Sequence, residues 1–126
     1  MKEAALLLVL IATGKATAYR EGIMDKVVQN RVEWGQIDTS LPHIGYVALA
    51  DKKYLGKRVL LELPSGEKVG PLLVADCGRE QDQQHLKDIG FAIDLSYELA
   101  MKYIKTAEKP LPGVKVWLIS VGNGEQ

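Results

Sequence analysis

The sequence predicts a small, mainly β domain whose strands close into a barrel. Three observations support this prediction. The chain has 126 residues, which is the usual length of one domain. Short apolar or alternating runs recur along it, separated by turns rich in glycine and proline. Only one or two segments show helical spacing. Closure removes the exposed strand edges that so small a sheet would otherwise carry.

Six runs have the length and patterning of strands, and turn-forming residues such as Pro64-Ser65-Gly66-Glu67 separate them. The final run alternates at first and then becomes mostly apolar, which is typical of a buried closing strand. The expected strands cover residues 15–19, 45–50, 59–63, 69–77, 91–95 and 114–121.

Two segments favour short helices. Between residues 24 and 34 the apolar side chains follow helical spacing, and Gly35 is expected to end that helix. A second helix is expected after Ser96, which has the side chain of a good N-cap, with Glu98 favourably placed in the first turn. Residues 79–87 are strongly polar and are expected to form an exposed loop or a short helix.

The N-terminus has the features of a secretory signal. Lys2 precedes an apolar run that ends at Ala12, and Ala16-Thr17-Ala18 has the small-residue form of a cleavage site. The run is too short to span a membrane as a helix. We expect two parts. Residues 1–14 are either a signal peptide or an apolar segment that stays in the domain, and residues 15–126 form a single domain. The expected location is outside the cell or in the cell envelope.

Composition argues against several kinds of partner. Lysine plus arginine equal aspartate plus glutamate, so the net charge is zero, whereas nucleic-acid binders normally carry a basic excess. The only cysteine, Cys77, excludes an intrachain disulfide and multi-cysteine metal clusters. His43 and His85 lack a third ligand at metal-site spacing, so no metal and no cofactor are expected. Strand alternation predicts that Cys77 faces the interior.

Three aspartates end apolar strands, at Asp51, Asp76 and Asp94. A partly buried carboxyl group has a raised pKa. Two such groups close together can separate into an acid and a base, which is the arrangement that glycosidic cleavage requires. The alternative is structural, because aspartate often ends strands and caps turns. Trp34 and Tyr46 are candidates for stacking on sugar rings, with ordinary packing as the alternative.

Five short patterns occur in order between residues 15 and 119. Together they resemble the six-stranded double-psi β-barrel superfamily, in particular the 3D domain of murein lytic transglycosylase A, rare lipoprotein A and bacterial expansins. The patterns are Ala16-Thr17-Ala18-Tyr19, Gly45-x-Val47-Ala48-Leu49-x-Asp51, Leu55-Gly56-Lys57-x-Val59, Val74-Ala75-Asp76-Cys77-Gly78 and Ile93-Asp94-Leu95-Ser96.

This resemblance implies a double-psi barrel that acts on peptidoglycan or another polysaccharide, either as a lytic transglycosylase or by expansin-like loosening. It implies that Asp76 is the acid/base, that Asp94 and Asp51 accompany it, and that Thr17 and Tyr19 face the glycan groove. Residues 24–37 match no pattern of the family, so the substrate stays open. The alternative is a non-catalytic glycan-binding or assembly module, such as a surface or virion component, on the same barrel. The oligomeric state is not predicted.

Overall fold

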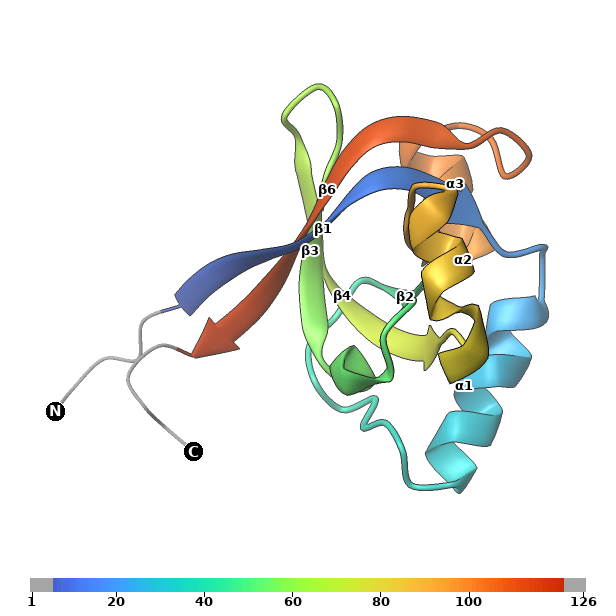
Figure 1. Ribbon diagram of the computed structural model, residues 1–126. Coiled ribbons are helices and arrows are strands. Elements are labelled where there is room, and N and C mark those ends of the chain that lie inside the picture. Colours follow the sequence, from blue (N-terminus) through green and yellow to red (C-terminus); the bar gives the residue numbers. More distant parts are fainter. Residues whose placement is uncertain (1–5, 122–126) are drawn as a thin grey trace, which may run out of the picture.

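The computed structural model describes residues 6–121, which form a six-stranded closed barrel with helices on its outside (Figure 1). The prediction of a mainly β closed barrel is therefore confirmed. The strands are β1 (Leu6–Ala18), β2 (Gly45–Leu49), β3 (Arg58–Glu62), β4 (Lys68–Cys77), β5 (Phe91–Leu95) and β6 (Leu111–Val121). The α-helices are α1 (Ile23–Glu33), α2 (Gln83–Asp88) and α3 (Tyr97–Tyr103), and the 3₁₀ turns are η1 (Lys52–Tyr54) and η2 (Glu80–Asp82).

Around the barrel the strands follow the order β1-β5-β2-β4-β3-β6. The pairs β1/β5 and β2/β4 are parallel, and the other four pairs are antiparallel. A parallel pair needs a crossover connection. Helices α1 and α2 both lie in the long segment between β1 and β5, whereas the connection from β2 to β4 contains η1 and β3.

Each expected strand is present, but two are longer than predicted. β1 begins at Leu6 rather than at residue 15, and β6 begins at Leu111. The described residues contain three α-helices instead of one or two, because the polar segment after Arg79 forms η2 and α2. The predicted cap is confirmed, since Ser96 Oγ accepts a hydrogen bond from the Leu99 N–H at 3.4 Å.

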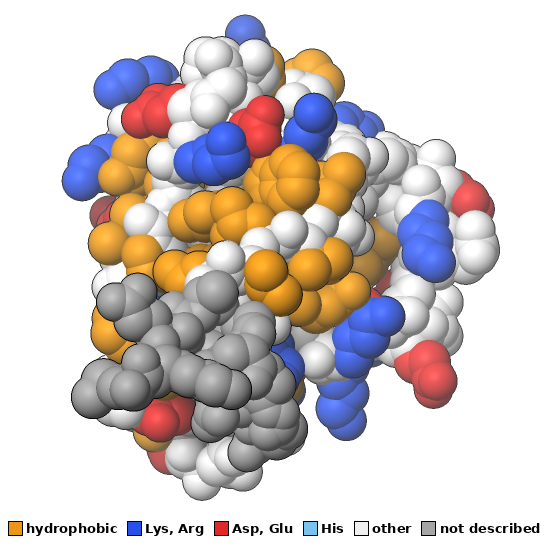
Figure 2. All heavy atoms as spheres, turned by 90° about the vertical axis from the view of Figure 1, so that its left-hand side faces the viewer, with side chains coloured by type: hydrophobic (Ala, Val, Ile, Leu, Met, Phe, Trp, Pro, Cys, Tyr) orange, Lys and Arg blue, Asp and Glu red, His pale blue; other side chains and the backbone are white. Residues whose placement is uncertain are grey.

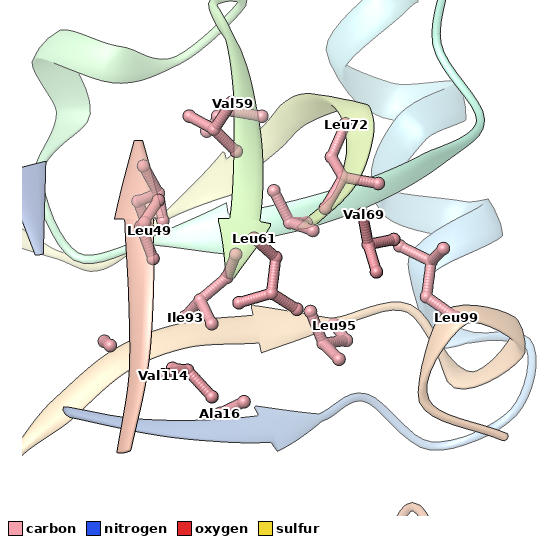
Figure 3. Packing of buried hydrophobic residues seen from close by; sticks show 14 of the residues in the cluster. Ala16, Leu49, Val59, Leu61, Val69, Leu72, Ile93, Leu95, Leu99 and Val114 are labelled. Atoms are coloured by element: carbon pink, nitrogen blue, oxygen red, sulfur yellow. The ribbon is translucent and has the colours of Figure 1, made fainter. Parts of the chain in front are cut away.

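The barrel interior is filled by alternate residues of the strands. Ala16 of β1, Leu49 of β2, Ile93 and Leu95 of β5 and Val114 of β6 gather in this core (Figure 3). Each large aliphatic side chain buried in this way contributes roughly 1.5–3 kcal/mol to folding. Because neighbouring residues of a strand point to opposite faces, the residues between these core positions face outward.

Helix α1 packs on the outside of the barrel. Met24 of the helix, Ile37 of the following loop and Ala75 of β4 form a second apolar cluster, and Tyr19 and Tyr46 pack against it. Val27 and Val28 of the helix also pack against this cluster. This cluster lies on the outer face of β4, next to Asp76.

A β-bulge at Ala75 determines which way Asp76 points. Val47 of β2 pairs with Val74, but the next residue, Ala48, pairs with Asp76, so Ala75 is an extra residue in β4. An extra residue shifts the alternation of side chains by one position. Ala75 and Asp76 therefore both lie on the outer face, toward α1, as the contacts of each show.

Candidate functional site

The site is a row of residues across four neighbouring strands. Thr17 of β1 pairs with Asp94 of β5, Asp94 pairs with Ala48 of β2, and Ala48 pairs with Asp76 of β4. Two strand spacings separate the aspartates, so their Cα atoms lie roughly 10 Å apart. The small side chain of Ala48 stands between them. The structure thus brings together three residues that the sequence singled out, Thr17, Asp76 and Asp94.

The Asp76 carboxylate accepts three hydrogen bonds. The Tyr19 hydroxyl donates to Oδ2 at 2.6 Å, and Arg31 Nη2 donates to Oδ1 at 2.6 Å. The backbone N–H of Cys77 also donates to Oδ1, at 2.9 Å. The Asp76 side chain remains 19% exposed. Its negative charge is balanced by the guanidinium, and its orientation is set by donors from three segments of the chain.

Arg31 is a site residue that the sequence analysis missed, because residues 24–37 match no pattern of the resembling family. Its Nη1 donates to Gln36 Oε1 at 2.5 Å, which orients the guanidinium toward Asp76. A signal was nevertheless present. Val27 and Val28 lie four and three residues before Arg31, so helical spacing places all three on the same face of α1. A charge on the apolar face of a helix indicates a buried partner.

Tyr19 joins the end of β1 to the site. Burial raises the pKa of the Tyr19 phenol well above its ordinary value, and the hydrogen bond to Asp76 and the negative charge of that carboxylate act in the same direction. The phenol therefore keeps its proton and remains a donor to Asp76 at neutral pH. This contact agrees with the expectation that Tyr19 belongs to the site.

Asp94 has a different environment from Asp76. Its Oδ1 is buried and has no hydrogen-bond partner among residues 6–121. Burial raises the pKa of Asp94 to about 6; the Thr17 hydroxyl opposes this shift and the negative charge of Asp76 adds to it. The Thr17 hydroxyl itself lies 3.5 Å from the Ile93 carbonyl oxygen, which is a long contact for a hydrogen bond. Asp94 is consequently the carboxyl group that retains a proton under mildly acidic conditions.

The third predicted carboxylate, Asp51, does not join this row. It caps η1, where Oδ1 accepts the Lys53 N–H at 3.0 Å, and Oδ2 lies 3.8 Å from Lys53 Nζ. This is the turn-capping role that the sequence left as the alternative. Asp51 nevertheless lines an open hollow of about 570 Å³ together with Arg31 and Cys77.

Cys77 does not lie in the core as strand alternation predicted. It is half-buried at the end of β4, lines the hollow beside Arg31, and its Sγ lies 3.9 Å from Arg31 Nη2. Cys77 is the last residue of β4, at the rim of the barrel beside the hollow, so alternation along the strand does not place it in the core.

The two candidate stacking residues differ in exposure. Trp34 follows the last residue of α1 and is 64% exposed, so its ring is available to a ligand. Tyr46 is half-buried against the α1 cluster and packs on His43, with ring centroids 4.7 Å apart. Packing therefore occupies most of Tyr46.

Within residues 6–121 no three histidine, cysteine, aspartate or glutamate side chains come together as a metal site. None of the helices described in this range is long and apolar enough to cross a membrane. Comparisons with protein-family models, with curated proteins and with solved structures found no match to this chain. The site must therefore be interpreted from its own geometry.

Proposed function

We propose that this protein is an exported double-psi barrel that acts on a cell-wall polysaccharide, with Asp94 as the general acid. Support for the barrel type comes from six strands in a closed order with two parallel pairs, together with the ordered sequence patterns. Support for the chemistry comes from one observation. Two carboxyl groups lie in the same row, and only one of them is in an environment that favours its protonated form.

Glycosidic cleavage needs one protonated carboxyl group beside one charged carboxylate, and the different environments of Asp94 and Asp76 match this requirement. In the proposed reaction, Asp94 donates its proton to the glycosidic oxygen as the bond from that oxygen to the anomeric carbon breaks. The Asp76 carboxylate stabilises the positive charge that develops on the sugar ring. Water, or a hydroxyl of the same sugar, then bonds to the anomeric carbon and returns a proton to Asp94. Arg31 and Tyr19 act as positioning residues, because they orient Asp76.

The test is the release of soluble fragments from purified peptidoglycan, measured by chromatography and mass spectrometry. Wild type is expected to release fragments, and Asp94→Asn is expected to lose at least about 100-fold in rate, since general acid catalysis contributes that much. Asp88→Asn is the matched control, because Asp88 is exposed on α2 and hydrogen-bonds only to Gln84 among the described residues. No release by wild type, or equal release by Asp94→Asn, would show that the enzymatic proposal is wrong.

The second candidate is a glycan-binding module without turnover. It is favoured by the fact that Tyr19, Arg31 and the Cys77 N–H already occupy both oxygens of the Asp76 carboxylate. The exposed ring of Trp34 would then provide a stacking surface. Co-sedimentation with insoluble glycan, without fragment release and with loss of binding in Trp34→Ala, would support this candidate over the enzyme.

A further inference from the structure

The outer ends of β1 and β6 form a two-stranded ribbon that projects from the barrel (Figure 1). Leu6 to Leu10 pair with residues 117–121 of β6. β5 joins β1 only from Lys15 onward. Among the described residues, the edge of β1 that faces away from β6 is therefore unpaired from Leu6 to Thr13. Its backbone N–H and C=O groups offer a template for another strand.

The side chains of this ribbon are apolar on both faces. All five residues from Leu6 to Leu10 are between 41% and 69% exposed. Because successive side chains of a strand alternate, these five divide between the two faces. The sequence has no charged residue from position 4 to position 14. Figure 2 shows hydrophobic side chains gathered over the side of the molecule toward which the ribbon projects.

Such a surface is unusual on a free monomer. Natural edge strands are normally protected by proline or by lysine and other charged side chains. β1 has none of these along its open edge from Leu6 to Thr13. The exposed parts of the five side chains amount to on the order of 500 Å², which is as large as the largest apolar patch of a typical monomer. A partner strand paired along this edge would satisfy the free backbone groups and cover the flank of each side chain that lies beside the edge.

We propose that the partner is a second copy of this chain, bound by antiparallel pairing of β1 with β1 around a two-fold axis at Val9. The product is a four-stranded sheet in the order β6-β1-β1-β6. A two-fold pairing places a strand opposite itself, and a strand without charges meets no like-charge repulsion there. The open edge from Leu6 to Thr13 is available for this pairing in each copy. The free edge of β6 is shorter, because β3 pairs with β6 as far as Leu118.

A hollow at the base of the ribbon fits this arrangement. It has a volume of about 340 Å³ and is lined by Ile11, Ala12 and Thr13 of β1 and by Phe91 of β5. Pairing about Val9 brings the partner's Leu6 opposite Ala12, so the end of the partner strand reaches this hollow. The apolar lining supplied by Ile11 and Phe91 suits a leucine side chain.

Sedimentation velocity of the full chain over a range of concentrations tests the proposal. We expect a monomer–dimer equilibrium for wild type, and a dissociation constant raised about tenfold or more in Val9→Lys, since one buried lysine would face its counterpart across the axis. Val32→Lys and Met101→Lys are matched controls. They replace apolar residues of α1 and α3 that are 45% and 42% exposed, and each should dimerise like wild type.

Hydrogen exchange keeps the test independent of any unfolding caused by Val9→Lys. Amides of residues 6–13 on the open edge should become protected as the wild-type concentration rises, while exchange in α2 stays unchanged. A wild-type monomer at all concentrations would overturn the proposal, and so would equal weakening by the control substitutions. It would also be overturned if the ribbon bound lipid vesicles instead of a second copy, or if the mature chain began after Gly14.

Discussion

Arg31 Nη2 lies 2.6 Å from Asp76 Oδ1, and this ion pair joins helix α1 to the end of strand β4. Both side chains are largely withdrawn from solvent, and the same carboxylate also receives the Tyr19 hydroxyl. The pair therefore holds together the helix, the bulged strand and the end of β1. It fixes the position of α1 over the row that contains Asp94.

We predict that Arg31→Ala destabilises the protein by about 2–4 kcal/mol, because it leaves the Asp76 carboxylate without its cation in a mostly buried position. Urea unfolding monitored by circular dichroism would measure the loss. Arg79→Ala is the control, since the Arg79–Asp82 pair has a comparable distance of 2.8 Å but is well exposed. Removing an exposed pair should cost no more than about 1 kcal/mol. Equal losses for both variants would contradict the role assigned to Arg31.

A second prediction concerns the pH dependence of stability. Burial raises the pKa of Asp94 from 3.8 to about 6, so between these two values the folded protein binds this proton more tightly than the unfolded chain does. The free energy of unfolding contributed by this group therefore decreases as pH rises from about 4 to about 6, and stays low above that range. Asp94→Asn removes this dependence, because its side chain does not ionise.

Asp94→Asn should therefore gain stability relative to wild type as pH rises through this window, by on the order of 2 kcal/mol in total. The measurement is urea unfolding of both proteins at pH 4, 5, 6 and 7. Asp88→Asn serves as the exposed control, for which the difference from wild type should change much less. A difference between Asp94→Asn and wild type that is constant with pH would contradict the buried environment of Asp94.

The sequence was sufficient to predict the strands and the closed mainly β barrel, and it singled out four residues that the fold brings together, namely Thr17, Tyr19, Asp76 and Asp94. Apolar periodicity and turn residues are local signals, and they located β2 to β5 closely. The same signals placed Thr17, Asp76 and Asp94 near strand ends. The contact between Arg31 and Asp76, 45 residues apart, depends on how α1 packs across the barrel. No local pattern contains that information.

Two further differences between the sequence prediction and the structure also depend on how the strands are arranged in the barrel. Strand alternation alone misplaced Cys77, because it does not show that β4 ends at this residue, at the rim of the barrel. The apolar run before Gly14 was compatible with a secretory signal and with a strand, because hydrophobicity is common to both. In the structure, residues 6–14 of this run form the first part of β1 and pair with β6. Whether residues 1–14 are removed on export stays a prediction.

Tyr19→Phe tests the hydrogen bond to Asp76 without removing the aromatic ring. We predict a loss of about 1.5–3 kcal/mol, because the bond is to a charged acceptor in a mostly buried site. Tyr97→Phe is the control, since none of the hydrogen bonds found within residues 6–121 uses the Tyr97 hydroxyl. The Tyr19→Phe loss should fall to near zero in an Asp76→Asn background, measured as a double-mutant cycle. Full additivity would show that the two residues are not coupled.

Gly14→Ala is predicted to destabilise the barrel by about 3 kcal/mol or more. Gly14 has φ +145°, and a Cβ atom there would lie 2.2 Å from the Gly90 carbonyl oxygen, a backbone atom that cannot move aside cheaply. Gly66→Ala is the control, because it has φ +94° but no atom within 4 Å of the added Cβ. That change should cost only about 1 kcal/mol. Thermal unfolding of both variants would compare them.

The last prediction concerns coupling between the two carboxyl groups of the row. The negative charge of Asp76 is one of the causes that raise the pKa of Asp94, so Asp76→Asn should lower the pKa of Asp94. NMR titration of the side-chain carboxyl carbon measures this directly and does not require any activity. If the protein cleaves glycan, the rate should decrease above about pH 6 in wild type, as Asp94 loses its proton, and this decrease should begin at lower pH in Asp76→Asn. Asp51→Asn, which alters a carboxylate outside the row, should leave the titration of Asp94 unchanged. An unchanged pKa of Asp94 in Asp76→Asn would mean that the two groups do not interact, and the division into an acid and a charged neighbour would then fail.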